Sequence, residues 1–230
     1  MHIPDGFING GTSAGAGIVA VGAVGVSLRR AADELDERRA PLAGLVAAFI
    51  FAVQMLNFPV ASGTSGHLLG GTLAAVLVGP YVAALCLSVV LLVQGLVFAD
   101  GGLSALGLNI VNMAVIGVGV GYLLFLMLRR LLPPGQRSVV VASAVAAGFS
   151  VVAAAIGFSI EYAIGGNGSA SAQTVAAAMI GVHTLIGIGE GVITGLTVGA
   201  VLAVRPDLVR GAPRQPVTAP AIAAKAARAA

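Results

Sequence analysis

Long stretches without charge limit the possible folds of this chain more than any other feature. Residues 40–99, 101–128 and 138–160 contain no Asp, Glu, Lys or Arg, and residues 162–204 contain only Glu190. A membrane-spanning helix needs about 20 consecutive apolar residues, which these stretches supply. Only 9% of all residues are charged, whereas a soluble domain has about 25%. A soluble globular fold is therefore excluded.

The apolar stretches divide into seven predicted spans, which makes the expected fold an all-α integral membrane protein. The stretch from residue 66 to residue 99 is too long for one crossing, and we expect Gly79-Pro80 to break it, because proline lacks an amide donor and crowds the preceding turn. The predicted spans are residues 7–28, 40–56, 66–79, 80–99, 103–128, 138–163 and 175–204.

The placement of the basic residues predicts how the chain is oriented. They form three clusters, at residues 29–39, 129–137 and 205–228. Basic residues gather on the cytoplasmic side of a membrane, so an even number of crossings must separate one cluster from the next. Four crossings between the first and second clusters and two between the second and third meet this condition. The N-terminus is then outside and the C-terminus inside. The net charge of +3 is thus explained by topology, and a nucleic-acid partner is not expected.

Two domains are predicted: a membrane-embedded domain over residues 1–204, and a disordered cytoplasmic tail over residues 205–230. The tail is rich in Ala, Pro and Arg and has no apolar period. At the other end, the first span lacks the basic region of a cleavable signal peptide and is preceded by Asp5. We therefore expect Met1 to remain in the mature protein, followed by the bulky His2.

His2 and His67 are the candidate side chains for a metal site. Under the predicted topology both lie on the outer side of the membrane, although 65 positions separate them. The Met1 amine, the His2 amide nitrogen and the His2 Nδ1 can chelate one ion in a single plane through a five- and a six-membered ring. His67 can fill the fourth corner. Four nitrogens in a plane favour Ni(II) or Cu(II), with Co(II) also plausible.

Three ionisable residues within the spans leave alternatives open. His183 and Glu190 are seven residues apart on the last span and so share one face. Such groups are functional candidates, but a structural role is favoured, in which they bond to each other or to Gln94, Asn109 and Asn112. Glu161 near the outer end of its span is interpreted as an interfacial anchor. Repeated glycines, at positions 187, 191, 195 and 199, predict close helix packing.

Several blocks of the chain, in order and at matching spacing, resemble the CbiM/NikM family. They are residues 1–7 (MHIPDGF), 54–59 (QMLNFP), 63–71 (GTSGHLLGG), 100–102 (DGG), 105–109 (ALGLN), 181–183 (GVH) and 189–191 (GEG). The resemblance implies a substrate-capture (S) component of an energy-coupling factor transporter, in a bacterial or archaeal cell membrane. It also implies metal binding by Met1, His2 and His67, with Co(II) or Ni(II) as transported ion and no permanently bound cofactor.

The same resemblance implies the partners: a membrane T component, cytoplasmic ATPase subunits and a small membrane subunit on a separate chain. The chain has no GxxxxGK[ST] phosphate-binding loop, so ATP hydrolysis is expected on the partners and the chain is not expected to be an enzyme. The donor set does not distinguish cobalt from nickel, and the naming of family members slightly favours cobalt for vitamin B12 (cobalamin) synthesis.

Two other classes of function remain as alternatives. A membrane metalloenzyme with His67, His183 and Glu190 as ligands or base would need a motif such as HExxH, which the sequence lacks. A passive metal-ion channel would show rings of carbonyl or acidic groups along a pore, whereas the polar residues here gather at the predicted outer face. The transporter component is the preferred interpretation.

Overall fold

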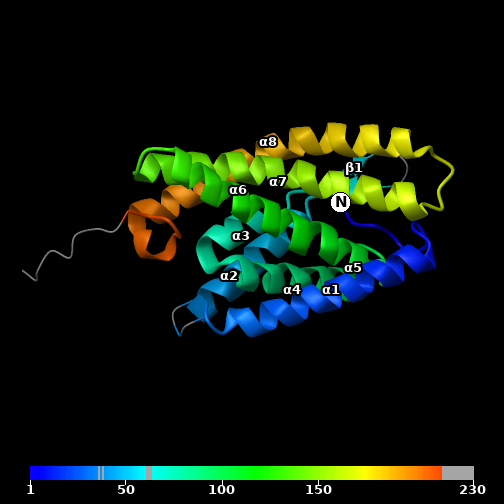
Figure 1. Cartoon of the computed structure of the whole chain (residues 1–230), viewed down its shortest axis with the longest axis horizontal. Helices are drawn as coiled ribbons and strands as arrows, with labels where there is room; N and C mark the ends of the chain where they lie inside the picture. Colours follow the sequence, from blue (N-terminus) through cyan, green and yellow to red (C-terminus); the bar gives the residue numbers. More distant parts are fainter. Residues whose placement is uncertain (36, 38, 61–63, 214–230) are drawn as a thin grey trace, which may run out of the picture.

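The computed structural model describes residues 1–35, 37, 39–60 and 64–213, and these residues form a bundle of helices (Figure 1). The helices in chain order are α1 (Gly10–Ala31), α2 (Arg39–Gln54), α3 (Gly71–Val78), α4 (Pro80–Val97), α5 (Leu106–Asn109), the π-helix η2 (Ile110–Gly117), α6 (Val118–Leu131), α7 (Gln136–Gly165), α8 (Ala172–Val204) and the short 3-10 helix η3 (Pro206–Leu208). Because α5, η2 and α6 follow one another without a break, they form one continuous rod.

Helix length separates complete membrane spans from shorter segments. Among the described residues, α1, α4, the α5–η2–α6 rod, α7 and α8 are long and apolar enough to cross a membrane. With 16 and 8 residues, α2 and α3 reach only about 24 and 12 Å, less than the roughly 30 Å of a hydrocarbon core. The chain is thus a multi-pass membrane protein. Among the described residues, five of the seven predicted spans thus have the length of a crossing, and the count of seven crossings stays a prediction.

The break between α3 and α4 lies at the predicted Gly79-Pro80. Gly79 adopts a φ of 96° between the two helices, a conformation that favours glycine. Pro80 then starts α4. The first residue of a helix makes no helical hydrogen bond through its amide, so a proline without that donor is tolerated there. The predicted span over residues 66–79 is only partly helical, however, because α3 begins at Gly71. The residues before it take an irregular path that the helical prediction missed.

A short antiparallel sheet was also not predicted. Strands β1 (Phe58–Val60) and β2 (Thr64–Gly66) pair with Pro59 opposite Ser65, in a region expected to be a loop. Pairing satisfies backbone groups that have no helical partner between α2 and α3. The fold is therefore mainly helical but not all-α. Gly63, the first residue of the 63–71 block, lies outside the described residues.

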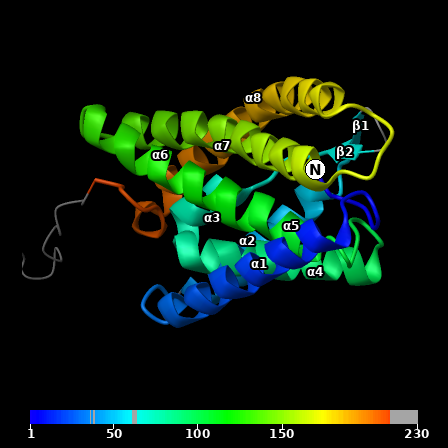
Figure 2. The same cartoon turned by 45° about the vertical axis from the view of Figure 1, so that its right-hand side comes forward.

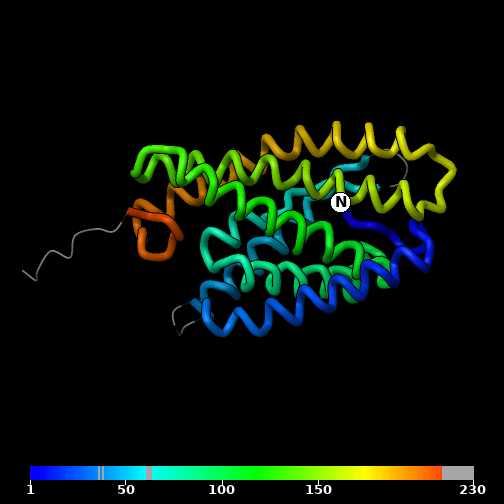
Figure 3. The backbone as a smooth tube through the Cα atoms, viewed as in Figure 1, coloured from blue at the N-terminus to red at the C-terminus, as the bar shows by residue number. Residues whose placement is uncertain are grey.

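The long helices α7 and α8 pack side by side in opposite directions (Figure 3). Glycines make the close approach possible: a Cβ atom on Gly187 would lie 2.7 Å from the carbonyl oxygen of Gly148, and one on Gly191 would lie 2.9 Å from that of Ala144. The glycine repeat on α8 thus serves helix packing, as predicted from the sequence.

The C-terminal residues that the structure describes fold back onto one end of the bundle. The Arg210 amide donates to the Val76 carbonyl oxygen at 2.9 Å, and the Arg129 guanidinium donates to the Gly211 carbonyl oxygen at 3.1 Å. Packing thus continues past the predicted domain boundary at residue 204, while residues 214–230 of the predicted tail lie outside the described residues. The N-terminus lies away from this end, beside the β1–β2 sheet (Figure 2).

Candidate metal site

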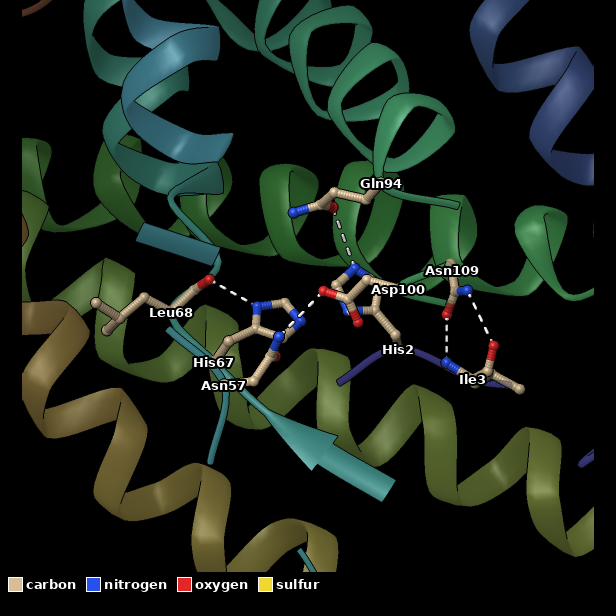
Figure 4. Close-up of polar contacts among 8 residues, drawn as sticks. All are labelled: His2, Ile3, Asn57, His67, Leu68, Gln94, Asp100 and Asn109. Carbon is tan, nitrogen blue, oxygen red and sulfur yellow. Dashed lines mark hydrogen bonds and ion pairs between the residues drawn. The ribbon is translucent and has the colours of Figure 1, made fainter. Parts of the chain in front are cut away.

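The first residues of the chain are buried inside the bundle instead of extending into solvent. Met1 and Ile3 have no exposed surface, and His2 is 4% exposed. The backbone of Ile3 is held on both sides: its amide donates to Asn109 Oδ1 at 2.8 Å, and its carbonyl oxygen accepts from the Gly102 amide at 2.8 Å. Chain termini are usually poorly ordered unless they are tied down. Here the ties hold the backbone next to His2 and the amine, and Figure 4 shows the bonds between Ile3 and Asn109.

The His2 ring lies between polar groups of α4 and of the loop that follows it. Its Nε2 is 3.2 Å from Gln94 Oε1, and its Nδ1 is 3.1 Å from Asp100 Oδ1. The Asn57 amide group donates to the other oxygen of Asp100 at 3.0 Å. Gly101 adopts a φ of 93°, and a Cβ atom there would lie 3.3 Å from His2 Cβ. The loop thus needs glycine to pass close to His2.

His67 lies directly against His2, although it comes from the segment between β2 and α3. The two rings stack with their centroids 4.4 Å apart and an angle of 26° between their planes. His67 is fully buried, and its Nδ1 donates to the Leu68 carbonyl oxygen at 2.9 Å. This bond leaves the lone pair on Nε2, which has no hydrogen-bond partner among the described residues. A buried lone pair without a partner is available to a metal ion.

Electrostatics favour the deprotonated forms of the three nitrogen groups. Burial lowers the pKa of the Met1 amine well below its usual value, against the charge of Asp100. Burial, followed by the charges of the amine and His2, lowers the pKa of His67 well below its usual range. Burial also lowers the pKa of His2, although its hydrogen bond to Asp100 opposes the shift. Metal ligands must be deprotonated, so this environment is suited to nitrogen coordination.

The Asp100 carboxylate stays ionised in the same cluster. Burial opposes its ionisation, but the hydrogen bond and charge of His2, together with the bond from Asn57, outweigh burial and lower its pKa. A carboxylate that accepts from a histidine sets the orientation of that ring. In the structure Nδ1 of His2 faces Asp100, so a chelate through this nitrogen requires the ring to turn toward the amine.

The donors gathered here differ from a site built only of side chains. The described residues hold no group of three or more His, Cys, Asp or Glu side chains arranged to bind a metal ion. The expected donor set of Met1, His2 and His67 does not require one, because the amine and the backbone amide nitrogen supply half of it. The structure brings these three residues together, as the sequence predicted. Their role as ligands stays a prediction.

His183 and Glu190 on α8 do not bond to each other. The His183 Nδ1 donates to the Met179 carbonyl oxygen at 2.7 Å, within the same helix. Glu190 accepts from the backbone amides of Leu69 and Gly70 instead. The expected partners Asn109 and Gln94 contact the N-terminal residues, whereas Asn112 donates to Glu161 at 2.5 Å. Glu161 therefore has a partner inside the bundle and is not simply the interfacial anchor that was predicted.

Gln94, Asp100 and Asn109 contact the N-terminal segment and were not predicted as site residues. Asp100 and Asn109 do fall in blocks that resemble the CbiM/NikM family, and Gln94 is one of few amides in an otherwise apolar span. Those signals mark the positions but do not indicate a partner. The assignment to His2 and Ile3 requires the folded arrangement of α4, α5 and the N-terminus (Figure 4).

Membrane-length helices that enclose the buried Met1, His2 and His67 define a multi-pass membrane protein with a polar site inside its bundle. Residues 2–208 match the profile of CbiM, the cobalt uptake substrate-specific transmembrane region. Because this match covers most of the 230 residues, the chain belongs to the CbiM family.

Individual relatives agree with this assignment. A Haloquadratum walsbyi protein with metal transport in its name is 41% identical over 212 residues, covering 91% of this chain and 93% of its own length. The fused nickel transport protein NikMN of Rhodobacter capsulatus is 38% identical over 164 residues, which are 71% of this chain and 47% of that protein. The crystal structure of a transition metal transporter matches with a TM-score of 0.82 and 33% identity, covering 89% of this chain and 93% of the other.

Proposed function

We propose that this chain is the substrate-capture component of an energy-coupling factor importer for Co(II) or Ni(II). The observation that carries the proposal is the buried His67 Nε2, which lacks a partner among the described residues and belongs to a ring stacked on His2. The ion would bind to the Met1 amine, the amide nitrogen and Nδ1 of His2, and Nε2 of His67. Capture would turn the His2 ring away from Asp100.

The proposed donor set explains why the first residues are packed so tightly. A chelate through an amine and the next amide nitrogen works only if the chain begins at that amine. Ile3, whose amide and carbonyl oxygen are both bonded, keeps the two residues before it in place. Preorganisation of this kind reduces the entropy lost when the ion binds. Neither cobalt nor nickel is singled out by the donors, because affinity in such a site rises from Co(II) to Ni(II) and further to Cu(II).

We further propose that the ion enters from the outer side of a bacterial or archaeal cell membrane and leaves toward the cytoplasm. Basic residues in the last turns of α1 and α6, and Arg210 after α8, lie toward one end of the bundle in the part of the chain that the structure describes (Figure 1), which supports a cytoplasmic location for that end. The N-terminus would then face outward. ATP hydrolysis would take place on separate cytoplasmic subunits, coupled through a membrane T component and accompanied by a small membrane subunit.

An N-terminal extension tests the donor set directly. Two residues placed before Met1 convert its amine into an amide and move the new amine out of the chelate ring, so we expect Ni(II) and Co(II) binding to be lost. Removal of the extension by a protease that leaves Met1 first should restore binding, and a C-terminal tag should have no effect. Calorimetric titration of the purified protein provides the measurement. Unchanged affinity in the extended protein would exclude the proposed ligands.

A further inference from the structure

Residues 67–70 form a buried segment without regular structure between β2 and α3. His67 and Leu69 have no exposed surface, and Gly70 has a φ of 75°. Buried backbone amides and carbonyl groups without a partner are costly in free energy. Gly70 makes a helical bond only through its carbonyl oxygen, which accepts from the Ala74 amide at 2.9 Å, and the amides of Leu69 and Gly70 have no strand or helix bond. The position of this segment, and therefore that of the His67 ring, depends on bonds from other parts of the chain.

Glu190 of α8 supplies two of these bonds. One carboxylate oxygen accepts from the Leu69 amide at 2.9 Å, and the other accepts from the Gly70 amide at 2.7 Å. Glu190 is 2% exposed, so these bonds form away from solvent. Two backbone amides that donate to one carboxyl group favour its ionised form. The carboxylate also lies where α3 begins, and a negative charge is favourable at a helix N-terminus.

Gln54 of α2 holds the same segment from another direction, since its side-chain amide donates to the Leu69 carbonyl oxygen at 2.8 Å. A side chain at position 70 is not tolerated either: a Cβ atom on Gly70 would lie 2.7 Å from Ile50 Cγ1. The backbone around Leu69 is thus bonded through both its amide and its carbonyl group. We use the term "segment clamp" for Glu190 and Gln54 together.

The His67 ring is coupled to this clamped backbone. Its Nδ1 donates to the Leu68 carbonyl oxygen at 2.9 Å, so the direction of Nε2 follows the path of the chain between Leu68 and Gly70. We propose that Glu190, supported by Gln54, is the positioning residue that aims His67 Nε2 at the captured ion. This inference rests on the proposed function, because it assigns a role to Glu190 through His67.

A double-mutant cycle between Glu190 and His67 tests the inference. Glu190→Gln keeps the size of the side chain but places an amide group opposite a backbone amide, so one bond to the segment is lost. We expect the affinity for Ni(II) alone to fall about tenfold in this variant. His67→Ala should also weaken binding by at least tenfold, and the double variant should bind no more weakly than His67→Ala, since a residue that acts through His67 has no effect without it.

Spectra and a matched control distinguish positioning from general loss of stability. The d–d absorption of bound Ni(II) reports its donor set, so Glu190→Gln should shift the spectrum toward that of His67→Ala. Glu161→Gln makes the same change at another partly buried carboxylate, one bonded to Asn112 on a different helix, and should leave affinity and spectrum unchanged. Melting curves show which variants are folded, and affinities are compared only among those.

The outcomes for these variants distinguish a failure of the proposed function from a failure of the positioning role of Glu190. Unchanged affinity in folded His67→Ala overturns the proposed function itself. A weakened His67→Ala variant combined with an unchanged Glu190→Gln variant, or with a double variant in which the two losses add, overturns only the positioning role. If Glu190→Gln does not fold, Gln54→Met tests the same clamp, because it removes the bond to the Leu69 carbonyl oxygen. A loss of Ni(II) affinity that disappears in the His67→Ala background supports the inference. A loss that adds to that of His67→Ala, or no loss at all, overturns it.

Discussion

The side chain of Asn109 bonds to both backbone polar groups of Ile3. Its Oδ1 accepts from the Ile3 amide at 2.8 Å and its amide group donates to the Ile3 carbonyl oxygen at 3.3 Å, across 106 positions of sequence. One asparagine side chain thus makes the two backbone bonds that a neighbouring strand would make. It holds the backbone immediately after His2, at the end of α5 where the π-helix η2 begins, and π-helical turns are frequent at functional sites.

Replacing Asn109 by leucine should therefore release the N-terminal segment. The buried Ile3 amide loses its partner, at about 1–3 kcal/mol, whereas the Ile3 carbonyl oxygen keeps its bond from the Gly102 amide. We expect Ni(II) affinity to fall by tenfold or more, since each 1.4 kcal/mol corresponds to about one factor of ten. Asn112→Leu, three residues further along the same rod and at a side chain that bonds to Glu161, is the control and should bind normally once folded. Calorimetric titration measures both; equal losses in the two variants would contradict this role.

The membrane character, the helix break at Gly79-Pro80 and the meeting of His2 with His67 could all be predicted from the sequence. Charge-free stretches and proline act locally, so their consequences do not depend on which helices pack together. The two histidines could be paired because the predicted topology places them on one side of a membrane. Each of these predictions needed only the linear order of the chain.

The contacts that build the site could not be predicted in the same way. The roles of Glu190, Gln94 and Asn109 depend on the packing of apolar helices, for which composition gives no register. Strands β1 and β2 have three residues each, too few for an alternating pattern to be recognised in the sequence. The irregular segment before α3 was predicted to be helical because it is apolar. Its backbone bonds go to side chains far away in sequence, which the sequence does not indicate.

Metal binding should depend less on pH in the folded protein than in the free peptide Met-His-Ile-Pro. In both, coordination by the amide nitrogen releases a proton. In the peptide, the amine and the imidazole are protonated below their usual pKa values of about 8.0 and 6.5, so at such pH they must also lose protons when the ion binds. Burial lowers the pKa of the Met1 amine and of His67 in the protein. We expect close to one proton released per ion between pH 6 and 8, against nearly two for the peptide, as measured by titration in buffers of different ionisation enthalpy.

The same lowered pKa values predict how the stability of the metal-free protein changes with pH. A base whose pKa is lower in the folded state than in the unfolded state is fully stabilising only above its unfolded pKa, and stability is lost as pH falls. The free energy of unfolding should therefore decrease from about pH 8 downward as the amine protonates in the unfolded chain, and further below about pH 6.5 through His2 and His67. His67→Gln should flatten the lower part of this curve. A curve that rises toward acid pH would contradict the assignment.

Gly102→Ala should damage the site through contact alone. A Cβ atom at this position would lie 2.6 Å from Asp5 Oδ1 and 2.7 Å from Asp5 Cα, so backbone must move. Overpacking of this kind costs about 1–3 kcal/mol, and the displaced chain carries His2. We expect at least a fivefold loss of Ni(II) affinity by titration. Gly119→Ala in α6 has open space around it and should bind as the wild type does; loss of affinity there would show that the assay reports general instability.

A second set of contacts, at the opposite end of the bundle, should affect stability without affecting the ion. Glu34 accepts from the amides of Tyr81 and Val82 at 3.0 Å each and lies 3.5 Å from the Arg210 guanidinium. Loss of such a cap at the start of α4 costs about 0.5–2 kcal/mol. Glu34→Ala should therefore lower the melting temperature and leave Ni(II) affinity unchanged. Asp207→Asn, which breaks an exposed ion pair, should change neither quantity.

Reporter fusions test the proposed orientation of the bundle. The C-terminal segment packs on the end that carries the basic residues: Arg129 donates to the Gly211 carbonyl oxygen and Arg210 pairs with Glu34. If basic residues gather in the cytoplasm, a reporter joined after Arg214 should be active on the inner side. A reporter inserted at the exposed Gly168, between α7 and α8, should be active on the outer side, because α8 is long enough to cross the membrane once. An outer signal after Arg214 would reverse the orientation and place the Met1 amine on the cytoplasmic side, where it could not capture an ion from outside.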